Sequence, residues 1–299
     1  MSDTRRTVLA DTEAGHQQQL VNERFDSHAQ DWDELYQKDD LFSVIIRHRH
    51  DRALGWIDDL ELPAGSRVLE IGPGAGLMTA ALARRGFQVA GADSAPRMIE
   101  IARRRAGQAV TTQASCAGQG ETTAGAGLML ADAHRLPFAA TTFSLVVALG
   151  VVPWLNSAQV AAEEMARVLR PGGYLLLNTS NRRRLSLLLD PWHCPALDRP
   201  RAGAKRALTA AGIRRPTPRP AITAHGLSEF DQILVRAGLQ PRRACTVGFG
   251  PFTLLRCPVL PDSLGVRVNA RIQQLTDRGT PGLRRTGNHY LVLARRPPK

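Results

Sequence analysis

The sequence predicts an α/β fold, a doubly wound and mostly parallel sheet with helices on both of its faces. Short apolar runs alternate with segments of helical periodicity between residues 67 and 177. Two of these runs, residues 88–93 and 128–132, end in an acid. The carboxyl ends of parallel strands share one edge of a sheet, so we expect both acids to face the same ligand-binding crevice.

The first unit comprises residues 67–77, which read Arg-Val-Leu-Glu-Ile-Gly-Pro-Gly-Ala-Gly-Leu. The apolar start predicts a buried strand, and the glycines predict a tight turn into a helix that begins at Leu77. Glycines allow positive φ and a close approach of a ligand to the backbone. The free N–H groups of the following helix point at the same place, so this turn is a predicted ligand site.

Other glycine-rich ligand motifs fit this turn poorly. A dinucleotide fingerprint needs a third glycine where the chain has Leu77, and Gly76 comes one residue early. A phosphate-binding loop needs a lysine and a hydroxyl residue, which Ala75-Gly76-Leu77 lacks. A short-chain oxidoreductase would need a Tyr-x-x-x-Lys pair, and none occurs in this chain.

The second unit is a strand over residues 88–93 that ends in Asp93. A carboxylate at this point can accept two hydrogen bonds from ribose hydroxyls. Ser94 is the predicted N-cap of a helix over residues 95–105. Met98, in the first turn of that helix, packs either on the ligand or in the core.

The later elements follow the same alternation of strands and helices. Residues 106–127 are rich in Gly, Thr and Ala and predict a flexible insertion. Strands are expected at residues 128–133, 143–149 and from Tyr174, with a helix before the Arg170-Pro171-Gly172-Gly173 turn. The continuous apolar run 143–149 is typical of a central parallel strand.

The glycine turn, Asp93, the segment Asp132-Ala133-His134-Arg135-Leu136-Pro137-Phe138 and the Leu-Arg-Pro-Gly-Gly turn together resemble the class I S-adenosylmethionine-dependent methyltransferases. The resemblance is closest to the ubiquinone/menaquinone-biosynthesis type and covers roughly residues 65–180. It implies a Rossmann-like, seven-stranded sheet. Its last strand, residues 289–294, would be antiparallel and inserted between the fifth strand and the sixth, residues 242–249.

The resemblance implies S-adenosyl-L-methionine as the cofactor. Asp93 would hold the ribose, and Asp132 would accept a hydrogen bond from the adenine amine while the N–H of Ala133 donates to the ring. The cofactor-binding residues expected from turn and resemblance together are Glu70, Gly72, Gly74, Gly76, Asp93, Ser94, Met98, Asp132, Ala133 and Leu149.

The implied reaction is in-line displacement of the cofactor's methyl group by an O, C or N atom of the acceptor. Such a reaction mainly requires positioning, so a general base is optional, and Tyr36 and His193 are the candidates for that role. Residues 151–154 lack the Asn/Asp-Pro-Pro-Tyr/Phe signature that grips a planar amino group, which favours a small-molecule acceptor. A nucleic-acid methyltransferase and a non-catalytic cofactor-binding protein remain the alternatives. No spacing indicates a metal site.

The domain organisation is expected to have three parts. Residues 1–20 are polar and predict a disordered tail, residues 21–62 a helical cap, and residues 63–299 the methyltransferase domain. Residues 182–221, after the fifth strand, predict a lid-like insertion. The cap is a second candidate for covering the acceptor.

Charge and cysteine content favour a cytoplasmic enzyme without a specific nucleic-acid partner. The net charge of +12 divides into −7 over residues 1–65, +3 over 66–181 and +16 over 182–299. The basic C-terminal third has few of the aromatic residues that usually accompany single-strand binding. The four cysteines form no Cys-x-x-Cys pair, and we find no secretory signal and no apolar run long enough to span a membrane.

Overall fold

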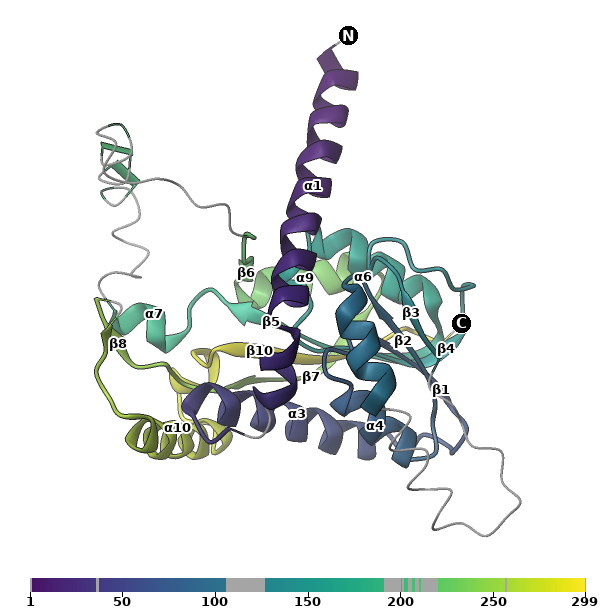
Figure 1. Cartoon of the computed structure of the whole chain (residues 1–299). Helices are drawn as coiled ribbons and strands as arrows, with labels where there is room; N and C mark the ends of the chain where they lie inside the picture. Colours follow the sequence, from purple (N-terminus) through teal and green to yellow (C-terminus); the bar gives the residue numbers. More distant parts are fainter. Residues whose placement is uncertain are drawn as a thin grey trace.

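The computed structural model describes residues 2–35, 38–105, 127–190, 220–255 and 257–298, together with residues 200, 202, 203, 206, 207 and 210. A central twisted sheet carries helices on both faces (Figure 1). Its strand order is β3-β2-β1-β4-β5-β10-β7, and the short strand β6 pairs with β5. The predicted doubly wound α/β fold is confirmed.

The strands are β1 Arg67–Ile71, β2 Gln88–Asp93, β3 Gly127–Leu130, β4 Phe143–Ala148, β5 Leu169–Asn181, β6 Ala224–His225, β7 Gln240–Val247, β8 Thr253–Leu254, β9 Cys257–Pro258 and β10 His289–Arg295. The pairs β1–β2, β1–β4, β2–β3 and β4–β5 are parallel. Strand β10 is antiparallel to both β5 and β7. The last strand is therefore inserted where the family resemblance implied.

The helices are α1 Ser2–Ser27, α2 Ala29–Glu34, α3 Leu41–Asp58, α4 Leu77–Arg84, α6 Ala158–Val168, α7 Leu185–Leu189, α9 Leu227–Arg236 and α10 Asp262–Asp277, with 3-10 turns η2 Val152–Trp154 and η4 Leu283–Arg285. A further helical segment covers residues 96–105. None of the helices in the described part of the chain has both the length and the apolar character needed to cross a membrane.

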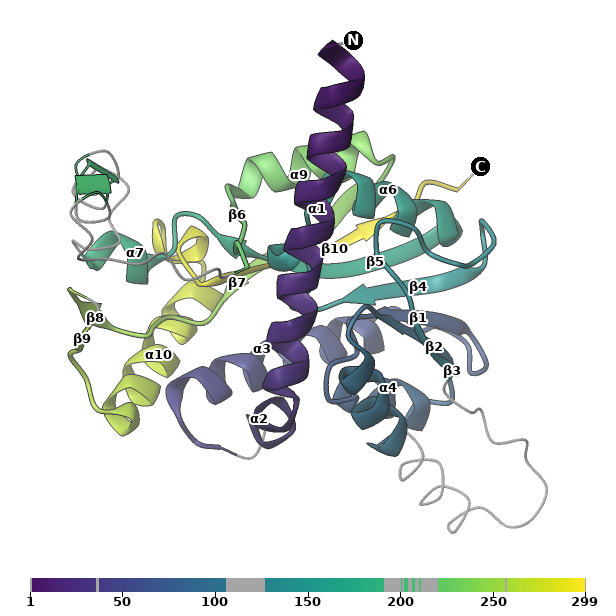
Figure 2. The same ribbon diagram turned by 45° about the horizontal axis from the view of Figure 1, so that its top comes forward.

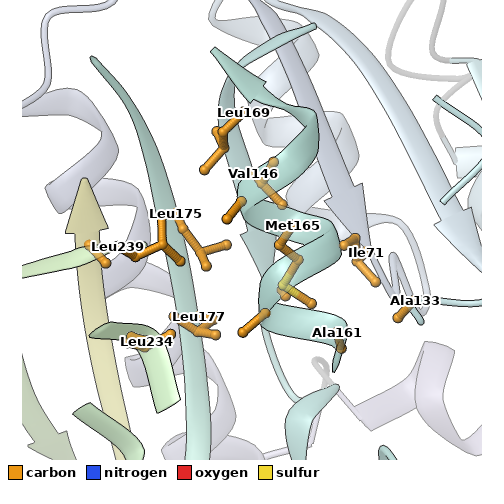
Figure 3. Packing of buried hydrophobic residues seen from close by; sticks show 14 of the residues in the cluster. Ile71, Ala133, Val146, Ala161, Met165, Leu169, Leu175, Leu177, Leu234 and Leu239 are labelled. Atoms are coloured by element: carbon orange, nitrogen blue, oxygen red, sulfur yellow. The ribbon is translucent and has the colours of Figure 1, made fainter. Parts of the chain in front are cut away.

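Two hydrophobic cores lie on opposite faces of the sheet. Alternate residues of one strand point to opposite faces, so Val146 faces one core while its neighbours Leu145 and Val147 face the other. Helices α6 and α9 cover the first face, where Met165 lies among Val146 and the leucines of β5 (Figure 3). Helices α3 and α4 cover the second face. All six residues of β4 are buried, which confirms it as a central strand.

The N-terminal segment differs from expectation. The predicted disordered tail over residues 1–20 is wrong, because Ser2–Ser27 form the single helix α1. Its polar residues have partners remote in the sequence: Gln17 exchanges two hydrogen bonds with the backbone of Ala221, and Gln18 donates to the Ser94 hydroxyl over 2.9 Å. In Figures 1 and 2 the start of α1 projects beyond the rest of the protein while its second half lies beside the sheet.

Two predicted insertions fall largely outside the described residues. Of the predicted flexible insertion 106–127, residues 106–126 lie outside, and residue 127 already begins β3. Of the predicted lid 182–221, the structure describes 182–190, 220, 221 and the six isolated positions. The described start of this insertion forms α7.

Candidate functional site

A cavity of about 580 Å³ lies at the carboxyl ends of β1, β2, β4 and β5. In open α/β sheets this edge is the usual position of a ligand, because loops and helix N-termini converge there. The cavity extends beyond the sheet to side chains of α1, α2, α3 and α7 and to the start of β10.

Nine of the ten predicted cofactor residues line this cavity, namely Glu70, Gly72, Gly74, Asp93, Ser94, Met98, Asp132, Ala133 and Leu149. Gly76 is not among the lining residues. A Cβ at Gly76 would lie 2.9 Å from the Cα of Ala102, and the residue has a φ of +77°. Gly76 therefore allows α4 to pack closely against helix 96–105, a different role from the predicted one.

The other two glycines of the turn have distinct surroundings. A Cβ at Gly72 would lie 2.4 Å from Cγ2 of Val151, so Gly72 permits contact between the turn and the segment after β4. A Cβ at Gly74 would meet only the terminal methyl of Met98, at 3.9 Å. Gly74 thus leaves open a space on the cavity wall that a side chain would fill, and a ligand can approach its backbone there.

Glu70 is buried behind the glycine turn, with 4% of its surface exposed. Its carboxylate accepts a hydrogen bond from the hydroxyl of Thr79 in α4. Burial, together with the nearby charge of Asp93, raises the pKa of Glu70 to about 7. This contact joins the end of β1 to α4 across the turn.

Asp93 ends β2 and faces the cavity. Its carboxylate accepts a hydrogen bond from the N–H of Ala95 over 3.0 Å, and burial raises its pKa to about 6. The predicted capping role of Ser94 is wrong: its hydroxyl donates to Asn22 over 2.8 Å and accepts from Gln18. The Ser94 hydroxyl is thus bonded to α1. The N–H of Ala95, just before helix 96–105, is already bonded to the carboxylate of Asp93.

Asp132 is held by a histidine that the sequence analysis did not single out. Oδ1 of Asp132 accepts from the backbone N–H of His134 over 2.9 Å and contacts its Nδ1 at 2.7 Å. Nε2 of His134 accepts from the N–H of Ser157 over 3.2 Å, so Nδ1 carries the proton. The hydrogen bonds from His134 keep the pKa of Asp132 below its ordinary value.

Aromatic side chains form a wall of the cavity, which we call the aromatic wall: Phe25, Trp32, Phe42 and Trp154. The rings of Phe25 and Trp32 are stacked at 5.6 Å, and Phe25 meets Trp154 edge-on at 5.2 Å. The wall brings α1, α2, α3 and η2 together. The predicted base candidates Tyr36 and His193 lie outside the described residues.

The end of the cavity beyond β4 is polar and basic. Arg49 of α3, Asn178 of β5, Arg184 and His289 line it. They come from four separate segments, so no local motif could have revealed that they meet. Among the described residues, no group of three or more His, Cys, Asp or Glu is arranged to hold a metal ion.

Residues 69–177 match the protein family described as a methyltransferase domain. The chain is 30% identical over 136 residues to a ubiquinone biosynthesis O-methyltransferase of Paracidovorax citrulli, covering 46% of this chain and 52% of that protein. It is 29% identical over 174 residues to a malonyl-[acyl-carrier protein] O-methyltransferase of Halorhodospira halophila, covering 58% and 52%. The chain thus spans about half the length of these two curated relatives.

Solved structures share the fold at low sequence identity. Magnesium protoporphyrin IX methyltransferase of Synechocystis PCC 6803 with bound SAH has a TM-score of 0.58 at 16% identity, over 94% of this chain and 99% of that one. The [4+2]-cyclase SpnF has a TM-score of 0.51 at 16% identity, over 84% and 81%. The domain match over residues 69–177, the strand order and the glycine turn beside the cavity together support a class I S-adenosylmethionine-dependent methyltransferase.

Proposed function

We propose that this protein transfers a methyl group from S-adenosylmethionine to a small-molecule acceptor. The observation that carries the proposal is the continuity of the cavity. One side is lined by the glycine turn, Asp93 and Asp132, and the other side by the aromatic wall. A cofactor and an apolar acceptor can therefore occupy one continuous cavity, next to each other.

The residues present fit the cofactor. The open space at Gly74 admits a ligand against the backbone of the turn. We assign the ribose hydroxyls to the carboxylate of Asp93, which lies at the end of β2. We assign the adenine to Asp132 and the N–H of Ala133, with Met98 and Leu149 as apolar neighbours.

When bound, the cofactor supplies an activated methyl group on a positively charged sulfur. The chain's own residues then need to hold the acceptor atom about 3–3.5 Å from that methyl and to exclude water. Helix α1 serves the second task, because Gln17 and Gln18 attach it to Ala221 and Ser94. The aromatic wall supplies apolar surface for the acceptor.

A small molecule fits this site better than a nucleic-acid base. Residues Val152–Trp154 form a 3-10 turn that places Trp154 in the aromatic wall, where nucleic-acid enzymes of this family carry their base-gripping signature. The two relatives named above act, by their names, in ubiquinone biosynthesis and on a malonyl-acyl-carrier protein. The [4+2]-cyclase SpnF shares the fold, so the fold alone does not determine the reaction.

The test supplies methyl-labelled cofactor to the protein with total RNA, DNA, cell protein or a small-metabolite extract in parallel. We expect label in the metabolite fraction, and at least roughly tenfold less of it with Asp93→Ala when the cofactor concentration is below the Kd of the unaltered protein. Label in RNA or DNA alone would replace the proposal with the nucleic-acid alternative. Binding of S-adenosylhomocysteine without transfer to any fraction would favour a non-catalytic cofactor-binding protein.

A further inference from the structure

The basic end of the cavity contains a cation, Arg184, that has no counter-charge among the residues the structure describes. Arg184 lines the cavity at the start of α7, and its guanidinium has no hydrogen bond or carboxylate partner among the described residues. Burial alone lowers its pKa. A partly buried cation is unfavourable unless an anion accompanies it, so this end of the cavity is preorganised for a negatively charged group.

The surroundings of His289 show that a second cation, Arg49, lies near Arg184. The imidazole lies at the start of β10, and its Nδ1 is buried without a hydrogen-bond partner among the described residues. Burial and the charges of Arg49 and Arg184 lower its pKa to about 3, so the ring is neutral near pH 7. The guanidinium groups of Arg49 and Arg184 are thus both close enough to lower the pKa of this one imidazole.

Asn178 adds a directed donor to this group. Its Oδ1 accepts the N–H of Gly150 over 2.8 Å, which orients the amide. Its Nδ2 is consequently a donor, and among the described residues it has no acceptor. Arg49 borders the same region, because a Cβ at Gly150 would lie 3.3 Å from its Nη1. Two guanidinium groups and an amide N–H therefore converge on one end of the cavity.

We propose that the methyl acceptor is an amphipathic anion, whose apolar body lies on the aromatic wall and whose carboxylate-like group is bound by Arg184, with Asn178 and Arg49 beside it. This inference rests on the proposed function and names the substrate class. Guanidinium and carboxylate groups form strong, charge-assisted hydrogen bonds, and the apolar wall favours a flat hydrocarbon body.

The experiment uses the full chain saturated with S-adenosylhomocysteine and two probes of equal shape, 2-naphthoate and the neutral 2-naphthamide. Calorimetry should show naphthoate binding about tenfold more tightly than naphthamide. Arg184→Gln should reduce naphthoate affinity about tenfold and leave naphthamide and S-adenosylhomocysteine affinities within about twofold. Arg184→Lys, which keeps the charge, should recover part of the loss. The exposed neighbour Arg183 is the control, and Arg183→Gln should change none of the three affinities.

Several outcomes would overturn the inference. Equal affinities for the two probes, no binding of naphthoate, or an unchanged naphthoate affinity in Arg184→Gln would each do so. A matching loss of S-adenosylhomocysteine affinity in Arg184→Gln would instead place Arg184 in the cofactor site. Failure of the proposed function is distinguishable, because it would appear as absent cofactor binding or absent methyl transfer by the unaltered protein. Circular dichroism and the Tm of each variant establish that it is folded.

Discussion

The hydroxyl of Thr79 donates a hydrogen bond to the buried carboxylate of Glu70, and this contact spans the glycine turn from α4 back to β1. Both groups are buried, so neither can exchange its partner for water without local unfolding. The acid of the turn thus has an evident structural role in addition to its position on the cavity wall.

Thr79→Val should lower the free energy of unfolding by about 1–3 kcal/mol, because it leaves the carboxyl of Glu70 without its donor. Glu70→Gln should be far milder at pH 8, since it preserves an acceptor for Thr79 and removes a buried charge. Denaturant unfolding at pH 8 measures both. If Thr79→Val were as stable as the unaltered protein, the contact would have no energetic role.

Asp93→Ala should weaken S-adenosylhomocysteine binding by about 1.5–3 kcal/mol, the usual contribution of hydrogen bonds to a charged group. The fold should persist, because Asp93 lies at the end of β2. Calorimetry gives the dissociation constant, with Asp262→Ala as the control, since Asp262 is exposed at the start of α10. An unchanged constant would remove Asp93 from the cofactor site.

The pH dependence of stability should report on the same carboxyl. The pKa of Asp93 is about 6 in the folded chain against an ordinary value of 3.8, so the folded state binds this proton more tightly. The ligand-free protein should therefore lose stability from this group as pH rises from about 4 through 6. Asp93→Asn removes the effect, so its stability relative to the unaltered protein should be higher at pH 8 than at pH 4. A difference that does not vary with pH would contradict the shift.

Cofactor affinity should have the opposite pH dependence. In the proposed site the ribose hydroxyls would donate to the ionised carboxylate of Asp93, so affinity for S-adenosylhomocysteine should fall as the pH is lowered below about 6. In Asp93→Asn this decrease should be absent. Calorimetry at pH 5 and pH 8 on both proteins tests the prediction. An equal change in the dissociation constant between the two pH values for both proteins would contradict it.

Gly74→Ala and Gly76→Ala should separate binding from stability. Both residues have positive φ, so each substitution adds roughly 1 kcal/mol of backbone strain. At Gly76 the Cβ also meets the backbone of Ala102 at 2.9 Å, which should add about 1–3 kcal/mol of overpacking. At Gly74 the Cβ instead fills space on the cavity wall, so cofactor affinity should fall with less loss of stability. Tm and calorimetry for the pair check this, and equal stability losses would contradict it.

The extent of what could be predicted from sequence is clearest at the glycine turn. The strand predicted at the start of residues 67–77, the helix predicted to begin at Leu77 and the strand predicted over residues 88–93 are observed as Arg67–Ile71, Leu77–Arg84 and Gln88–Asp93. Their signals are local: apolar runs, glycine punctuation and a terminal acid. The distinct roles of Gly72, Gly74 and Gly76 were not predictable, because they depend on Val151, Met98 and Ala102, which are remote in the sequence.

By itself the sequence determined the sheet, its position in a family of cofactor-binding folds and the edge at which Asp93 and Asp132 meet. It did so because parallel strands align their carboxyl ends, whatever loops connect them. Only the tertiary structure decided that α1 is attached to Ser94, and that Arg49, Asn178, Arg184 and His289 meet at one end of the cavity. Those residues lie on four separate segments, and their convergence follows from tertiary packing such as that of α3 against β10 and of β10 against β5, which has no local signature in the chain.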